Sequence, residues 1–417
     1  MSWQKEVDEI GKRKKLAEAM GGPEKLKKQK ADGKLNARER IAGLVDKGSF
    51  REIGQLGGAA TYDAKGDLKS FLPSNMLFGR AKIEGRPVVV QSDDFTVRGG
   101  AADAAIHEKL VQSEKLAGEY RMPLVRMIEG TGGGGSVKTL ETMGFTYVPE
   151  VPGWDLMVDN LSLIPVVALG LGPVAGLGAG RLVMSHYSLL VKGLSQLFVA
   201  GPPVVAAVGE KRTKEELGGS HIHAKNGAID DEAASEAEAF AMARTFLSYL
   251  PSSIHELPER KPTRDKPDRR EQFLIEAVPR DLRHLYKIRP IIEAVVDQGS
   301  FFEIGRQHGP SIVTGFARID GYPVGIMASD PMVLGGLWTA ATARKVERFI
   351  DLADTFHLPV VHMVDNPGFM IGRKAEEDGT IRYGSRAMTA VYQSKVPICV
   401  VILRKVYGMG GSAPANL

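Results

Sequence analysis

Two glycine-rich segments are the residues of this sequence best suited to chemistry, because they can bring bare backbone to a ligand. The first, Gly132–Gly135, follows the apolar run 124–128, and the second, Gly408–Gly411, follows the apolar run 397–403. A glycine turn between a strand and a helix leaves N–H groups free to bind an anion. Two such groups aimed at one oxygen form an oxyanion hole. We expect the loops to occupy equivalent positions of the chain, although ordinary tight turns also use glycine.

Two oxyanion holes favour a reaction in which two oxygens gain negative charge. Enolate formation at a thioester is one such change, and loss of carbon dioxide from a carboxylated urea is another. The sequence has no GxSxG or HExxH motif, and no constellation of side chains in it stands out as catalytic. His221 and His223 alternate in one segment. We interpret them as hydrogen-bonding residues, because two ligands alone are a weak signal for a metal.

The loops belong to a pattern that occurs twice in the chain. The recurring segments are 46–50 with 297–301, 52–54 with 303–305, 85–87 with 321–323, and 99–100 with 335–336. A repeat of this length predicts a duplicated domain. We place the domains at residues 1–255 and 286–417, joined by a proline-containing charged linker at 256–285. Gly176 matches Gly408, and because only nine residues follow Gly408, we expect the second domain to be truncated at its C-terminus.

The elements around the loops follow the order strand, helix, strand in both halves. In the first half, a buried strand at 88–90 precedes a helix at 101–120 and the strand 124–128. In the second half, the corresponding segments are 316–328, 337–356 and 359–364. A strand, helix and strand in this order predict a right-handed parallel crossover, and hence an α/β fold.

The composition and charge of the chain limit the classes of protein to which it can belong. The net charge of +4 over 417 residues does not favour nucleic-acid binding. The apolar run 161–180 contains two prolines and five glycines, so we interpret it as a strand at 163–169, a loop from Gly170 and a helix start, and expect no membrane insertion. The first residues are too charged for a secretory signal, and one cysteine permits no disulfide within the chain. We expect a cytoplasmic protein, or one of the mitochondrial matrix in a eukaryote.

Several motifs together carry a resemblance to a known family. They are 35–41 (LNARERI), 46–50 (DKGSF), 94–97 (DFTV) with Gly99–Gly100, Gly132–Gly133, 201–202 (GP), 215–219 (EELGG) and 364–369 (VDNPGF). The chain resembles the carboxyltransferase (beta) subunit of biotin-dependent acyl-CoA carboxylases, typified by propionyl-CoA carboxylase. The resemblance implies tandem crotonase-like spiral domains in a ring-shaped homohexamer, with active sites between subunits.

The resemblance also implies roles for residues. Gly132 and Gly133 match the loop whose amide holds the acyl-CoA thioester oxygen, and Met409 and Gly410 match the loop that holds the ureido oxygen of biotin. The remaining substrate-binding residues implied in this way are Phe95, Gly99, Gly100, Gly134, Gly176, Pro367, Gly368, Phe369, Gly408 and Ser412. Biotin arrives on a partner, the biotin carboxylase or biotin carrier subunit. In such enzymes its ureido nitrogen takes the substrate proton, and this subunit holds no metal.

Alternative functions remain open at this point. A biotin-dependent decarboxylase or transcarboxylase runs the same half-reaction in the other direction, and the same amides stabilise the same transition states. A hydratase or isomerase needs a positioned acid or base, for which the nearby carboxylates are Glu129 and Glu141. A scaffold homologue would bind coenzyme A, or hold the biotin carrier, without catalysis.

Overall fold

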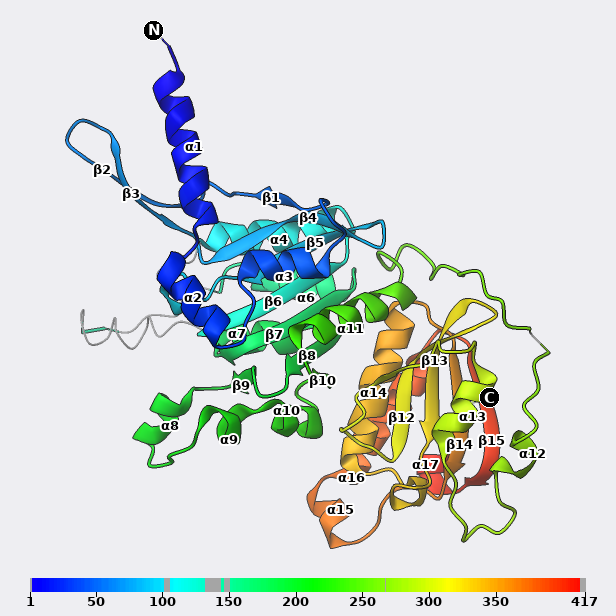
Figure 1. Cartoon of the computed structure of the whole chain (residues 1–417). Coiled ribbons are helices and arrows are strands. Elements are labelled where there is room, and N and C mark those ends of the chain that lie inside the picture. Colours follow the sequence, from blue (N-terminus) through cyan, green and yellow to red (C-terminus); the bar gives the residue numbers. More distant parts are fainter. Residues whose placement is uncertain (1, 101–105, 132–143, 146–150, 267, 413–417) are drawn as a thin grey trace. The chain divides into compact units, whose positions relative to one another are not determined.

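The computed structural model describes residues 2–100, 106–131, 144–145, 151–266 and 268–412 (Figure 1). These residues form two compact units, each described here by itself. Unit 1 comprises residues 1–222 and 232–244, and unit 2 comprises residues 223–231 and 245–417. The sequence-based boundaries stay a prediction. The expected linker 256–285 lies within unit 2, and backbone bonds such as Lys261 N–H to Gly321 O, at 3.0 Å, hold it to the rest of that unit.

Unit 1 is built on a mixed sheet with the strand order β1-β4-β5-β6-β7-β8-β10, in which β9 also pairs with β7. Its described strands are β1 (Arg51–Ile53), β2 (Gly58–Tyr62), β3 (Leu68–Pro73), β4 (Met76–Ile83), β5 (Arg86–Asp93), β6 (Leu124–Thr131), β7 (Val166–Ala175), β8 (Tyr187–Val191), β9 (Gln196–Phe198) and β10 (Asp231–Ala233). Its described helices are α1 (Gln4–Glu18), α2 (Pro23–Ala31), α3 (Ala37–Leu44), η1 (Arg98–Gly100), α4 (His107–Glu119), α6 (Trp154–Leu161), α7 (Leu177–Val183), α8 (Pro202–Ala207), α9 (Lys214–Gly218), α10 (Ser220–Asn226) and α11 (Glu236–Tyr249), the last two of which continue into unit 2.

Unit 2 repeats this plan with the strand order β11-β12-β13-β14-β15. Its described strands are β11 (Phe302–Ile304), β12 (Ile312–Ile319), β13 (Tyr322–Ser329), β14 (Val360–Asn366) and β15 (Ile398–Val406). Its described helices are α12 (Leu274–Ala277), α13 (Ile288–Val295), η3 (Leu334–Gly336), α14 (Ala340–Thr355), α15 (Arg373–Glu377), α16 (Thr380–Gln393) and α17 (Gly408–Ser412). In both units the hairpin is antiparallel and the strands after it are parallel, which confirms the predicted duplication.

The repeated aspartate explains why both hairpins turn in the same way. The carboxylate of Asp46 accepts the N–H groups of Glu84 and Gly85, at 3.0 and 2.8 Å. The carboxylate of Asp297 accepts those of Asp320 and Gly321, at 2.9 and 2.7 Å. Both turn glycines have positive φ angles, a region that glycine enters without steric cost. The recurring sequence thus fixes the β4–β5 and β12–β13 turns.

Helices cover both faces of the unit 2 sheet. Ile288 and Ile292 of α13 pack with Val313 and Ile326 on one face. Phe316 points to the other face, because alternate residues of a strand face opposite sides, and its ring centroid lies 5.9 Å from that of Phe349 on α14. The core therefore lies on both sides of the central strands, which leaves the strand ends available for a site.

One expected boundary is wrong. We predicted that the chain leaves the strand for a loop at Gly170, whereas β7 continues to Ala175 through Gly172 and Pro173. The pairing of β6 with β7 shifts register between Ile128 and Gly130, opposite this stretch. Proline and glycine are tolerated in strands at such irregular positions. The expected helix start is confirmed as α7.

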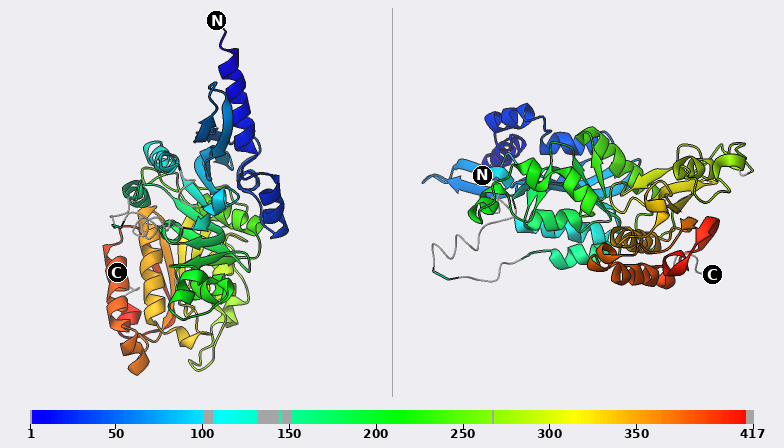
Figure 2. Two further views of the ribbon diagram at one scale, coloured as in Figure 1. Left: turned by 90° about the vertical axis from the view of Figure 1, so that its left-hand side faces the viewer. Right: turned by 90° about the horizontal axis from the view of Figure 1, so that it is seen from below.

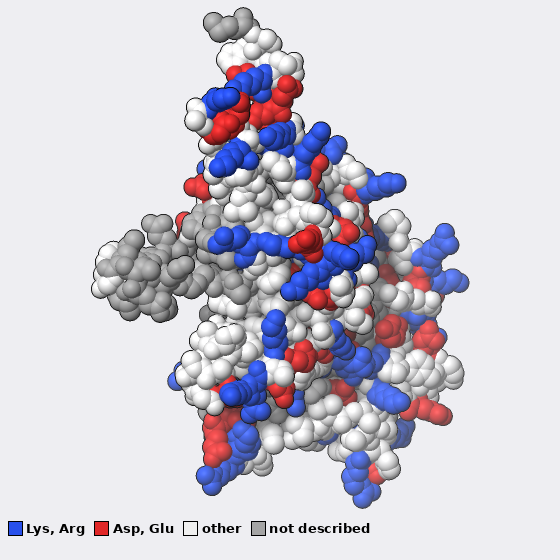
Figure 3. Space-filling model, turned by 60° about the vertical axis from the view of Figure 1, so that its left-hand side comes forward, with Lys and Arg blue, Asp and Glu red and all other residues white. Residues whose placement is uncertain are grey.

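The surface of unit 1 includes an N-terminal projection. Helix α1 lies along the β2–β3 hairpin (Figures 1 and 2), and Lys12 Nζ donates to Leu68 O at 3.0 Å. Lys and Arg side chains are interspersed with Asp and Glu over the face drawn in Figure 3. Within the described residues, every helix is too short or too polar to cross a bilayer.

Candidate functional site

The glycine segment of unit 2 sits at the carboxyl end of its parallel strands. Asn366 ends β14, and its side-chain amide donates to Gly410 O at 2.6 Å while its side-chain oxygen accepts Gly368 N–H at 2.7 Å. A β-carbon on Gly410 would lie 2.8 Å from Phe369 Cδ1 and 2.9 Å from Gly368 C. The close approach explains why glycine occupies position 410. Ser412 Oγ donates to Gly408 O at 2.8 Å.

The first turn of α17 carries backbone donors that have no acceptor among the described residues. Gly408 has a φ of +59° and starts the helix directly after β15. Among the described residues, none accepts a hydrogen bond from the N–H of Met409 or Gly410, as expected for the first turn of a helix. The Met409 residue is 47% exposed. These amides have the chemistry of an anion site.

Backbone contacts also fix the loop that packs against Gly410. Gly336 has a φ of +85°, and a β-carbon there would lie 2.4 Å from Asp365 O. Trp338 N–H donates to Gly368 O at 3.0 Å, and Met370 N–H donates to Trp338 O at 2.8 Å. The loop at Pro367–Phe369 is thus held between η3 and α17.

A buried carboxylate on β14 binds two basic residues of the neighbouring strand β15. Asp365 is fully buried and lies 2.9 Å from Arg404 Nη2 and 3.7 Å from Lys405 Nζ. It also accepts the Lys405 N–H at 3.1 Å. A buried carboxylate needs this compensation, and we assign Asp365 a structural role.

The equivalent edge of unit 1 repeats the backbone contacts. Gly100 has a φ of +71°, and a β-carbon there would lie 2.9 Å from Gly130 Cα. Phe95 lies beside Gly99 and Gly100, with Lys34 Nζ 5.1 Å from its ring centroid. Gly176 has a φ of +56°. Its N–H donates to Phe198 O at 3.3 Å, so this amide is engaged.

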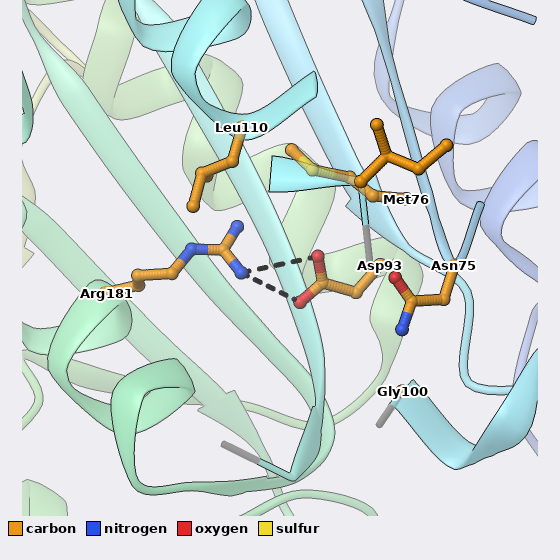
Figure 4. Close-up of a pocket in the computed structure, with 7 residues that line it drawn as sticks. Asn75, Met76, Asp93, Gly100, Leu110 and Arg181 are labelled. Carbon is orange, nitrogen blue, oxygen red and sulfur yellow. Dashed lines mark hydrogen bonds and ion pairs between the residues drawn. The ribbon is translucent and has the colours of Figure 1, made fainter. Parts of the chain in front are cut away.

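A small cavity of about 110 Å³ opens at this edge of unit 1 (Figure 4). Its lining residues are Asn75, Met76, Asp93, Gly100, Ile106, Leu110 and Arg181. Arg181 Nη1 faces both carboxylate oxygens of Asp93, at 3.3 and 3.4 Å. Burial raises the pKa of Asp93, and the Arg181 charge opposes that rise. The cavity therefore presents a charge pair beside Gly100.

Sequence reasoning missed Asp93 and Arg181. The available signal was position: Asp93 ends the buried strand that precedes the Gly99–Gly100 turn. The carboxyl ends of parallel strands are the usual ligand-binding edge of α/β sheets. No comparable signal marked Arg181, because its place on α7 depends on where β7 ends.

Glu129, one of the carboxylates expected near the site, is committed to ion pairs. It is fully buried, at 2.5 Å from Lys34 Nζ and 2.6 Å from Arg40 Nη1. Arg40 also donates to Glu236 at 2.8 Å and to Leu171 O at 2.7 Å. Glu129 is thus a structural anchor at the end of β6 rather than a free base.

The expected acyl-CoA loop and its neighbour Glu141 lie outside the described residues. Gly132, Gly133 and Gly134 therefore stay predictions. The expected equivalence of the two glycine loops is wrong, because Gly132 follows β6, whose counterpart is β14, whereas Gly408 follows β15, whose counterpart is β7. The structural counterpart of Gly408 is Gly176, as the repeat predicted. In the described part of the chain, no cluster of three or more His, Cys, Asp or Glu could hold a metal ion.

Comparison with known proteins agrees with this architecture. The family model described as carboxyl transferase domain matches residues 28–414. The chain is 31% identical to the propionyl-CoA carboxylase carboxyltransferase subunit of Haloferax mediterranei, over 98% of this chain and 78% of that relative. It is 32% identical to the methylmalonyl-CoA decarboxylase subunit alpha of Veillonella parvula, over 97% and 79%.

Solved structures support the fold over the whole chain. The transcarboxylase 12S crystal structure, a hexamer assembly with methylmalonyl-coenzyme A bound, superposes with a TM-score of 0.89 at 30% identity. That similarity covers 100% of this chain and 81% of the other. The predicted α/β fold of tandem crotonase-like domains is confirmed. The chain belongs to the carboxyl transferase domain family.

Proposed function

We propose that this enzyme transfers a carboxyl group from carboxybiotin, carried on a partner protein, to the α-carbon of an acyl-CoA thioester. The observation that carries the proposal is the pair of amides at Met409 and Gly410, which have no acceptor in the described part of the chain and lie at the strand edge of a carboxyl transferase fold. The relatives described above are named for propionyl-CoA or methylmalonyl-CoA. We propose the same substrate class here, in a homohexamer like that of transcarboxylase 12S.

The residues of this chain act in the proposal by holding oxygens. Carboxybiotin supplies the carboxyl group. The N–H groups of Met409 and Gly410 donate to its ureido oxygen, and those of Gly132 and Gly133 donate to the thioester oxygen. Each preorganised donor of this kind contributes about 3–4 kcal/mol to transition-state stabilisation. The wall at Gly368 and Phe369 keeps α17 in register with β14.

The direction of transfer is open to a second candidate, a decarboxylase or transcarboxylase. The relative in Veillonella parvula carries the name of a decarboxylase subunit at an identity of 32%. The same amides serve both directions, because they stabilise one transition state. Isolation of the native complex discriminates between them: a subunit with ATP-dependent biotin carboxylase activity indicates a carboxylase, and a membrane sodium pump indicates a decarboxylase.

Two further candidates are weaker. A hydratase or isomerase requires an acid or base at the acyl-CoA, and Asp93 is the one observation in its favour, since burial raises its pKa beside the cavity. A scaffold would bind coenzyme A without turnover. Because the single cysteine permits no disulfide within the chain, as is usual in reducing compartments, we further propose that the enzyme works in the cytoplasm, or in the matrix of mitochondria.

The test uses the full chain with free biotin and methylmalonyl-CoA or malonyl-CoA. We expect biotin-dependent loss of carbon dioxide, and we expect Gly133→Val to lower it about 100-fold or more with unchanged far-UV circular dichroism. Gly11→Ala is the matched control, because a β-carbon there meets nothing within 4 Å. Wild-type rates in Gly133→Val would remove the assignment of that loop, and no turnover with either thioester would favour the scaffold.

A further inference from the structure

The two units contain equivalent grooves beside a buried lysine. In unit 1, Lys109 Nζ donates to Met76 O at 2.7 Å, and in unit 2, Lys345 Nζ donates to Ile312 O at 2.8 Å. A β-carbon on Gly54 or on Gly305 would lie 3.4 Å from Cε of the respective lysine. The local construction is therefore the same in both halves.

In unit 2 the groove is covered by the segment 223–231, which we name the covering segment. Asp231 Oδ1 accepts the Gly305 N–H at 3.2 Å, and the Asp230 carboxylate binds Arg348 through two bonds of 2.9 Å. His308 Nδ1 lies 3.1 Å from Lys225 O. The groove of unit 2 thus holds one carboxylate at a backbone N–H and a second at an arginine.

In unit 1 the groove is open, with a volume of about 340 Å³. Among the described residues, none accepts a hydrogen bond from Gly54 N–H. Ile53 is 37% exposed, whereas its counterpart Ile304 is 6% exposed. The lining residues on which the inference depends are Ile53, Gly54, Phe78, Lys109, Gln112 and Leu116.

The two lysines differ in the number of carboxylates that act on them. Burial lowers the pKa of both lysines to about 8. At Lys345, the negative charges of Asp231, Glu303 and Asp330 oppose this lowering of the pKa, while the positive charge of Arg289 adds to the lowering. At Lys109, Glu52 opposes the lowering of the pKa, and Arg38 adds to it. Among the described residues of unit 1, none supplies a carboxylate in the place that Asp231 takes in unit 2.

We propose that the unit 1 groove binds a turn of another polypeptide, which places an aspartate or glutamate carboxylate at Gly54 N–H. A free N–H next to a buried ammonium group favours a carboxylate. The apolar walls made by Ile53, Phe78 and Leu116 favour an aliphatic residue shortly before this aspartate or glutamate in the occupant. In the covering segment, Ile229 likewise comes shortly before Asp231. This inference is independent of the proposed catalytic function.

The residues at the rim of the unit 1 groove favour an occupant that differs from the covering segment at one position. Gln112 stands where unit 2 has Arg348, and Glu108 stands where it has Arg344. The rim of unit 1 is therefore neutral to acidic, and the occupant carries a neutral or basic residue where the covering segment has Asp230. A second carboxylate on the occupant would meet the neutral to acidic rim, whereas the first meets Gly54 N–H beside Lys109. The groove is therefore selective for an occupant with a single carboxylate.

The probe is a fluorescent peptide with the sequence of residues 223–231, titrated into the full chain and followed by anisotropy. We expect Asp231→Asn in the peptide to weaken binding about tenfold, the loss expected for a charge-assisted hydrogen bond. We expect Gln112→Arg in the protein, an exposed position, to strengthen binding about threefold by recreating the contact of Arg348. This gain must vanish when the peptide carries Asp230→Asn.

Two controls separate the groove from other sites. Ile53→Asp places a carboxylate at an exposed groove residue and should abolish binding without unfolding the chain. Absence of peptide binding, or binding that ignores Ile53→Asp, Gln112→Arg and the Asp231→Asn peptide, would overturn the proposal. Competition by butyrate at the same concentration as unlabelled peptide would also overturn it, since the occupant would then be a small carboxylate.

Discussion

The charge network around Arg40 gives a prediction whose size follows from the structure. Arg40 is fully buried between Glu129, also fully buried, and Glu236, 5% exposed. In the Arg40→Met variant, Glu129 keeps its ion pair with Lys34, and Glu236 keeps the hydrogen bond from the N–H of Leu35. Removing one partner of a buried ion pair costs about 3–5 kcal/mol. Because both carboxylates keep one contact, we expect a loss of about 4 kcal/mol in the free energy of unfolding of unit 1.

Arg38→Met is the matched control on the same helix. Arg38 lies 2.8 Å from Glu52, but its side chain is 28% exposed, and partly exposed pairs of this kind contribute about 1 kcal/mol or less. Urea denaturation followed by far-UV circular dichroism, with one transition fitted for each unit, measures both variants. Equal losses in Arg40→Met and Arg38→Met would refute the reasoning.

The pH dependence provides a second test of the same network. Burial raises the pKa of Glu236, and Arg40 opposes the rise. Without Arg40 the pKa in the folded state rises further above the value in the unfolded chain, so the folded variant binds a proton more readily. Its stability is then present at low pH and lost as pH rises through the folded pKa. The deficit of Arg40→Met should therefore shrink between pH 7 and pH 5, and a constant deficit would contradict this.

Two further predictions concern the site and the paired lysines. Gly410→Ala brings a β-carbon to 2.8 Å from Phe369 Cδ1, so we expect the α17 amides to shift and biotin-dependent turnover to fall about 100-fold or more with little change in KM for the acyl-CoA; an unchanged rate would exclude Met409 and Gly410 as donors. Burial lowers the pKa of Lys109 and Lys345 to about 8, below the unfolded value, so the folded state releases these protons first and stability rises with pH from about 8 to 10. In the Lys109→Met/Lys345→Met variant this rise should be smaller, as measured by urea denaturation at each pH, and an equal slope would show that other groups cause it.

The repeated segments allowed the fold to be predicted from sequence. Asp46 and Asp297 fix the same turn in both halves, so their recurrence carried direct structural information. The end of β7 was mispredicted, because Gly172 and Pro173 are tolerated in a strand opposite an irregular pairing, and the register shift between Ile128 and Gly130 is not visible in sequence.

The sequence marked single segments of the candidate site, and it did not show which distant residues meet there. Pro367–Phe369 and Gly408–Gly410 were named separately, and the structure packs Gly410 against Gly368 and Phe369, while their roles in binding stay a prediction. The contact between Asp93 and Arg181 joins residues that are 88 positions apart, and each alone is an ordinary charged residue. Their meeting depends on the packing of α7 against the sheet, which no local pattern reports.

The glycines at positions 100 and 336 bring main chain, not side chains, into contact with the end of a neighbouring strand. Gly100 packs against Gly130, and Gly336 packs against Asp365. The position of the main chain at these two strand ends is therefore fixed by backbone contact. In unit 1, Met76 and Leu110 line the cavity beside Gly100, so substitutions of these side chains would change the shape of the cavity while the backbone contact of Gly100 stays in place.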